Sequence, residues 1–154
     1  METLTDMNAE TIEKLQNLTK VNLDSSEGFR VAANACEDNA LVSLFSQISR
    51  TRAEFARRLQ GFVAVNGEEP EDEGSWAGKA HRWWLELRAK IASDESYAVL
   101  CEAERGEDSI KHMYEEVLKD TAGSPVNDVL LEQYAEVKRM HDRVRDLRDA
   151  HRKS

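Results

Sequence analysis

Residues 41–62, LVSLFSQISRTRAEFARRLQGF, carry the pattern that decides the fold. Apolar side chains recur every three or four positions, the spacing of one face of an α-helix. They are Leu41, Leu44 or Phe45, Ile48, Phe55, Leu59 and Phe62. Arg52 interrupts this stripe midway, where another apolar residue would be expected. The segment therefore predicts a helix that buries one face and carries an arginine in the middle of it.

Three other long segments repeat this interruption. Asn22 interrupts the apolar stripe from Leu15 to Cys36. Glu107 interrupts the stripe from Leu100 to Val117, and His141 interrupts the stripe from Leu130 to Val144. Each polar residue lies where the 3.6-residue period predicts a buried side chain. The chain thus predicts four amphipathic helices, each with one polar residue in its apolar face.

Turn and capping signals divide the chain between these stripes. Asn8 is a suitable N-cap, residues 37–39 form a polar corner, and Gly67 opens the acidic loop 67–75. Ser93 or Asp94 opens the next long helix, and Ser124 with Pro125 reads as a cap followed by proline at the first helical position. No segment alternates as a strand does. We predict one all-α domain, residues 1–154, with long helices at about 9–36, 39–66, 95–121 and 125–150 and a shorter helix at about 76–92.

The four interruptions are predicted to lie at one level of the bundle. If the first two helices are antiparallel, Asn22 and Arg52 both lie about 20 Å below the corner that joins them, at ~1.5 Å per residue. The helix at 76–92 is expected to carry the chain back up the bundle. Glu107 and His141 then lie roughly 14–18 Å below the same end. Together with Lys138, which precedes His141 by one helical turn, they predict a polar layer inside the bundle.

Composition limits the classes of partner. Hydrophobic residues make up 40% of the 154 residues and charged residues 33%, as in an ordinary folded domain. The net charge of -9 argues against nucleic acid and anionic membranes, whose phosphates attract clustered Lys and Arg. No stretch approaches the ~20 apolar residues that span a bilayer, and residues 1–6 lack the apolar run of a secretory signal. Cys36 and Cys101 stand outside any metal-binding or CxxC spacing. We therefore expect a cytoplasmic protein with reduced thiols.

Three tryptophans gather in the helix predicted at 76–92. Trp76, Trp83 and Trp84 share it with Leu87 and Ile91, so packing of one face onto the bundle accounts for most of the cluster. Two adjacent tryptophans cannot both face the same core. One of them is expected to cover a second subunit, which predicts a homodimer formed through this helix.

Three segments resemble the bacterial ferritin-like four-helix-bundle proteins of unknown function. They are GEEPEDEGSWAGKAHRWW at 67–84, CEAERGEDSIKHMYEEVL at 101–118 and EVKRMHDRVR at 136–145. The resemblance covers nearly the whole chain. It implies a ferritin-like four-helix bundle whose shorter fifth helix lies in the long crossover between bundle helices 2 and 3. It also implies an association with bacterial stress-related gene sets, and it supplies no activity.

The wider ferritin-like group implies a di-metal site, which this sequence lacks in most positions. Such a site uses one Glu on each of two helices and Glu-x-x-His on each of the other two, for iron or manganese. Glu107 matches the lone Glu of the third bundle helix, and His141 the His of the last. The sequence departs elsewhere: Asn22 replaces the first Glu, Arg52 and Phe55 replace the second helix's pair, and Lys138 replaces the last Glu.

Arg52 is predicted to take the place of the metal. A guanidinium within ~4 Å of a dication would repel it by several kcal/mol in a low-dielectric core. We expect a buried, hydrogen-bonded pair between Arg52 and Glu107, completed by Asn22 and His141, and no bound metal or cofactor. The function predicted is therefore a non-catalytic structural or interaction role.

One alternative remains open at the level of the sequence. A metal site in a shifted register would join Glu107 and His141 with Glu27, Glu104 or Glu136, and would make the protein an iron or manganese binder or oxidase. These acids, like Asp108 beside them, otherwise belong to solvated helix faces.

Overall fold

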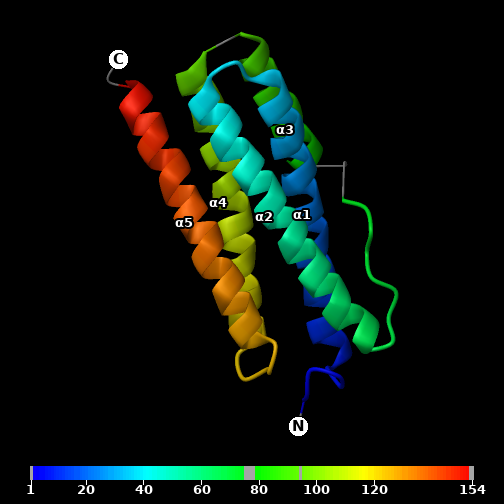
Figure 1. The fold of residues 1–154 in the computed structure, drawn as a ribbon. Helices are drawn as coiled ribbons and strands as arrows, with labels where there is room; N and C mark the ends of the chain where they lie inside the picture. The colour runs from blue at the N-terminus through cyan, green and yellow to red at the C-terminus, as the bar shows by residue number, and fades with distance from the viewer. Residues whose placement is uncertain (1, 75–78, 94, 153–154) are drawn as a thin grey trace.

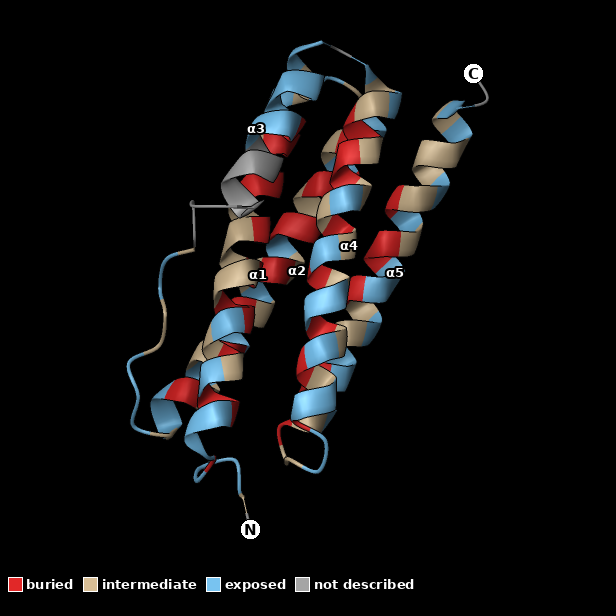
Figure 2. Ribbon diagram, turned by 180° about the vertical axis from the view of Figure 1, so that it is seen from behind, coloured by how far each residue is buried: buried red, intermediate tan, exposed pale blue. Residues whose placement is uncertain are grey.

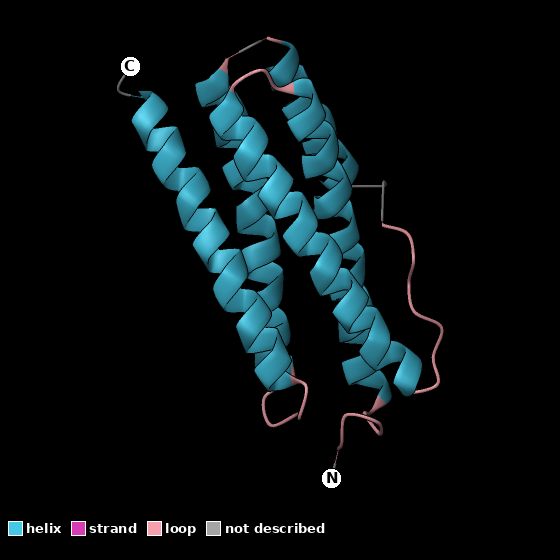
Figure 3. Ribbon diagram, in the orientation of Figure 1, coloured by secondary structure: helices cyan, strands magenta, loops and turns pink. Residues whose placement is uncertain are grey.

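The computed structural model describes residues 2–74, 79–93 and 95–152; the side chains of residues 79–84 also lie outside the described part. Five helices form within these ranges: α1 (Ala9–Ala35), α2 (Asn39–Val65), α3 (Lys79–Ala92), α4 (Ser96–Asp120) and α5 (Asn127–Arg152). Figure 3 shows helices joined by loops, and no strand is assigned in these ranges beyond an isolated bridge between Thr3 and Asp6. The protein is all-helical, as predicted from the apolar periodicity.

The bounds of the four long helices agree with the predicted bounds to within two residues. The cap of α1 is also as predicted, because the Asn8 side chain accepts a hydrogen bond of 2.8 Å from the Thr11 amide. Gly67, at φ 81°, takes up the left-handed conformation that ends α2. No described helix is long and apolar enough to cross a membrane.

The starts of the last two helices differ from the prediction. α5 begins at Asn127, because Ser124 and Pro125 form a turn in which the Asn127 amide donates to the Ser124 carbonyl at 3.0 Å. Before α4, the Ser93 hydroxyl donates to the Lys90 carbonyl at 2.7 Å and so closes the end of α3. Asp94, the alternative cap, lies outside the described residues.

The long helices lie side by side as two antiparallel hairpins, α1 with α2 and α4 with α5 (Figure 1). Between them the chain climbs back through the acidic loop after α2. The side chain of Gln16 holds this loop against α1, donating to the Glu69 carbonyl and accepting from the Glu71 amide, each at 2.9 Å. From α2, Gln60 donates to the Glu71 carbonyl at 2.8 Å.

The described part of the crossover helix covers only part of the bundle. α3 occupies the end near the α1–α2 corner, where it packs against α1 and α4 (Figure 1). The loop therefore makes part of the return that the sequence assigned to the helix. Trp76 lies outside the described residues, as do the side chains of Trp83 and Trp84, so the predicted tryptophan contact falls outside the described structure.

Buried apolar residues form two clusters, one toward each end of the bundle. Figure 2 shows that the buried positions lie along the inner faces of the helices. The cluster near the α1–α2 corner includes Phe29, Phe45, Leu87, Leu100 and Val144. The opposite cluster includes Leu15, Leu18, Leu59, Ile110 and Leu130. Buried polar residues occupy helix positions between the two sets, among them Asn22, Ser25, Ser49, Arg52 and Glu107. The interruptions in the stripes therefore mark a polar level between two apolar cores.

Candidate functional site

An ion pair lies at the centre of this polar level. The guanidinium of Arg52 on α2 donates to both carboxylate oxygens of Glu107 on α4, with Nη1 to Oε1 at 2.7 Å and Nη2 to Oε2 at 2.6 Å. Both side chains are 0% exposed. The structure thus contains the pair that the two interrupted stripes predict, in the bidentate geometry that best fits an arginine to a carboxylate.

A third helix completes the polar contacts of this pair. Nη1 of Arg52 also donates to the Ser25 hydroxyl on α1 at 2.9 Å. The Nε atom of Arg52 is buried and has no hydrogen-bond partner. The pair therefore connects α1, α2 and α4, and removal of either charged partner would leave the other desolvated and uncompensated.

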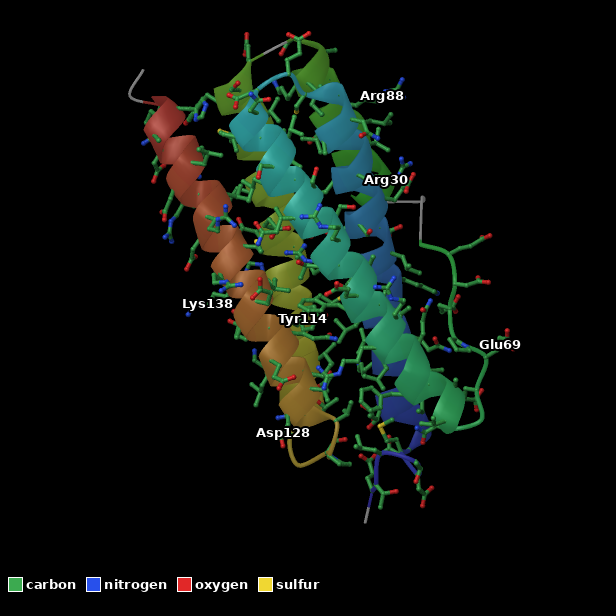
Figure 4. The ribbon with its side chains drawn as sticks, in the orientation of Figure 1. Arg30, Glu69, Arg88, Tyr114, Asp128 and Lys138 are labelled. Atoms are coloured by element: carbon green, nitrogen blue, oxygen red, sulfur yellow. The ribbon has the colours of Figure 1, made fainter. Side chains whose placement is uncertain are left out.

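Asn22 belongs to a second, neighbouring network. Its side-chain amide donates to the Tyr114 hydroxyl and to the Leu18 carbonyl, both at 2.8 Å. The Tyr114 hydroxyl in turn donates to Oε1 of Gln133 on α5 at 2.7 Å. Burial raises the pKa of the Tyr114 phenol well above its ordinary value, so the hydroxyl stays protonated and able to donate. Figure 4 shows Tyr114 on α4 within the bundle. Asn22 thus hydrogen-bonds to Tyr114, whereas the sequence predicted that it would complete the ion pair.

His141 likewise bonds away from the ion pair. Its Nε2 lies 2.6 Å from Oδ1 of Asp108 on α4, and its Nδ1 lies 3.1 Å from Oδ1 of Asp142. The hydrogen bond from His141 is the first cause that lowers the pKa of Asp142. The prediction that His141 would complete the Arg52–Glu107 pair is therefore wrong; the imidazole lies at the edge of the buried level and faces two carboxylates.

Lys138 does not belong to the polar level, contrary to the prediction. The residue is exposed, and Figure 4 shows it on the outer side of α5. His141 already lies at the margin of the buried face of α5, and a residue three positions earlier is about 60° farther round the helix. This rotation about the helix axis is enough to place Lys138 in solvent.

The three acids of the alternative metal site have different environments. Glu27 forms an exposed ion pair with Arg30, whose hydrogen bond lowers its pKa, and Glu136 pairs with Arg139 at 2.6 Å. Neither is grouped with His141 in the described structure. Glu104 does lie beside His141, together with Asp108. Glu107 is hydrogen-bonded to Arg52 and does not join this group. The possible metal ligands that the structure brings together are therefore Glu104, Asp108 and His141.

Sequence reasoning missed four members of the polar level and its margin: Ser25, Asp108, Tyr114 and Gln133. Gln133 is buried, whereas the neighbouring Tyr134 is half-buried and donates to Glu115 at 2.6 Å. Gln133 lies three residues after Leu130 and four before Val137, a spacing that could have identified it. Asp108 lies four residues after Glu104, the spacing that places both on one helix face.

Comparison with known proteins identifies a family for this chain but no activity. Residues 10–120 match the model of a family described as "Domain of unknown function (DUF2383)". The match covers α1, α2, α3 and α4 and includes Arg52 and Glu107. No curated protein matches the chain.

Proposed function

We propose a non-catalytic structural or interaction role for this chain, which belongs to the family described as Domain of unknown function (DUF2383). The observation that carries the proposal is the fully buried Arg52–Glu107 pair. Both oxygens of this carboxylate accept from one guanidinium, so the one acid at the centre of the bundle is already neutralised.

A ferritin-like di-metal centre does not fit these residues. Two dications need about four carboxylates between the helices, whereas the described polar level offers one carboxylate, that of Glu107, together with amides, hydroxyls, a phenol and a guanidinium. The guanidinium would also have to leave its carboxylate before an ion could approach. The core layer thus favours a metal-free scaffold over the alternative of a di-iron or di-manganese oxidase.

We also propose that the chain is a ferritin-like bundle, that it acts in bacterial stress and that it lies in the cytoplasm. A long connection between two antiparallel helix pairs supports a ferritin-like bundle, and the resemblance of the segments at 67–84, 101–118 and 136–145 supports a stress-related role in bacteria. Neither Cys36 nor Cys101 belongs to a CxxC or metal-binding spacing, which favours a cytoplasmic location.

Metal analysis of the purified protein tests the proposal. We expect His141→Gln protein prepared without chelators to contain iron and manganese far below one ion per chain. We also expect no acceleration of ferrous iron oxidation when it is mixed with ferrous iron in air. Near-stoichiometric iron or manganese that is retained by His141→Gln protein, or rapid ferrous oxidation, would reject a metal-free core and favour the oxidase alternative.

A homodimer through α3 is the interaction that we propose. Leu85 on α3 is 48% exposed, so this helix presents at least one large apolar side chain to solvent. A second copy of the chain would remove such surface from water.

Sedimentation velocity at micromolar concentration tests the dimer. We expect the wild-type chain to sediment as a species of twice the 17.5 kDa monomer mass. The Leu85→Glu variant should shift toward monomer because it places a charge in the contact. Leu131→Glu on α5, which alters a residue of equal exposure, is the matched control and should stay dimeric. A monomer at every concentration would exclude this assembly.

A further inference from the structure

Three metal-ligating side chains converge on the face between α4 and α5. Glu104 and Asp108 come from α4 and His141 from α5, and one ligand atom of each lies within 4.8 Å of the others. The side chain of His141 is 11% exposed and that of Glu104 15%, whereas that of Asp108 is 47% exposed. The cluster is therefore anchored in the bundle on one side and open to solvent on the other.

The His141 imidazole is held in an orientation that suits a metal ligand. Asp142 lies 3.1 Å from Nδ1 of His141, which leaves Nε2 directed at Asp108. A carboxylate on the far nitrogen of a histidine fixes the ring and strengthens the other nitrogen as a metal ligand. Because Glu104 and Asp108 are four residues apart, α4 presents both carboxylates on one side. The arrangement joins two oxygen ligands, one nitrogen ligand and a supporting acid on packed helices.

We infer that Glu104, Asp108 and His141 bind one divalent transition-metal ion. Two carboxylates neutralise a dication, and one imidazole with two carboxylates is a ligand set that Zn²⁺ and Mn²⁺ accept. The ion would replace the hydrogen between Nε2 of His141 and the Asp108 carboxylate, which lie 2.6 Å apart, and the displaced proton would be released to solvent. Solvent water would fill the remaining coordination positions on the exposed side of Asp108.

Arg148 is the competitor for this ion. Its guanidinium forms an ion pair with Glu104, and its Nη2 also lies 2.9 Å from Oδ1 of the Asp149 carboxylate. When an ion binds Glu104, Arg148 can keep its contact with Asp149 and leave the cluster. A cation that is already present lowers the affinity of the site for a second, so removal of Arg148 should strengthen metal binding.

The site is independent of the metal-free core. It uses none of the residues that hydrogen-bond to Arg52 or Glu107. It holds one ion at the margin of the bundle, whereas the ferritin-like centre holds two ions at its middle. Failure to find a metal ion at Glu104, Asp108 and His141 would therefore not affect the proposal of a metal-free core, and the reverse also holds. Binding without ferrous oxidation supports both.

Calorimetric titration of metal-stripped protein with Zn²⁺, repeated with Mn²⁺, tests the site. We expect one ion per chain for at least Zn²⁺. Asp108→Asn and His141→Gln should each weaken binding by at least about tenfold. Asp142→Asn, which alters a residue that contacts the ring and Arg145 but is not a ligand, should weaken it by about tenfold or somewhat more. Arg148→Gln should tighten binding by up to about fivefold, the range expected for a partly exposed ion pair.

The matched control is Glu116→Gln, which removes an exposed acid of α4 that pairs with Lys119. Its affinity should equal that of the wild-type protein. Circular dichroism establishes that each variant keeps its helices, and Asp108→Asn alters a half-exposed side chain, so it tests the site even if His141→Gln unfolds. Absence of binding, or binding that Asp108→Asn and Glu116→Gln leave equally unchanged, would overturn the inference.

Discussion

Replacing Arg52 by Ala is expected to lower the free energy of unfolding by about 3–5 kcal/mol. The substitution leaves the Glu107 carboxylate fully buried with neither of its two charged hydrogen bonds, and it removes a partner of Ser25. Urea denaturation followed by circular dichroism measures the loss. Glu54→Ala is the matched control, because Glu54 is an exposed acid two residues away on α2, and it should change stability by less than about 0.5 kcal/mol.

The double variant Arg52→Met, Glu107→Leu separates the cost of halving the pair from the contribution of the pair. Both charges leave the core together, so no uncompensated ion remains, and stability should return to within about 1 kcal/mol of wild type or exceed it. Equally small losses for Arg52→Ala and Glu54→Ala would contradict the importance of the pairing. The double variant should also leave Zn²⁺ binding at Glu104, Asp108 and His141 unchanged, because none of these three side chains hydrogen-bonds to the pair.

Tyr114→Phe is expected to cost about 1–3 kcal/mol. The change removes one oxygen and leaves the Asn22 amide without one of its two acceptors and the Gln133 carbonyl oxygen without its donor, all inside the bundle. Tyr134→Phe is the matched control, because the Tyr134 hydroxyl also bonds a side chain but lies at a half-buried position.

The control should cost less than about 1 kcal/mol, since water can replace the phenol beside Glu115. Thermal unfolding followed by circular dichroism compares the two variants at one pH. A loss for Tyr134→Phe as large as that for Tyr114→Phe would show that burial of the network does not govern its energetics.

The helices could be predicted because the signals that form them are local. A helix of 27 residues such as α2 needs only its apolar period and a terminal cap, and both are present within residues 38–67. The positions of Arg52 in α2 and Glu107 in α4 could also be predicted locally, since each replaces one apolar residue of a regular stripe. Their pairing followed from helix lengths and from the charge of Arg52 against Glu107.

The partners of Asn22 and His141 could not be predicted in the same way. Which atoms come within 3 Å depends on the rotation of each helix about its own axis and on the side chain opposite. Lys138 shows how sensitive this is, because about 60° of rotation separates it from His141 and moves it from the core margin to solvent. For the same reason the sequence did not identify Asp108 as a partner of His141. Its four-residue spacing from Glu104 is equally typical of a solvated helix face.

Periodicity and the identities of a few interrupting residues were enough to establish an all-helical chain with a buried charge pair, because an arginine and a glutamate inside apolar faces must find each other. The packing of α4 against α1 and α5 decided the rest. It joined Asn22 to Tyr114 and Gln133, and it assembled Glu104, Asp108 and His141 on one edge. Contacts between helices are set by relative rotation and depth to within an ångström or so, and no stretch of sequence contains that information locally.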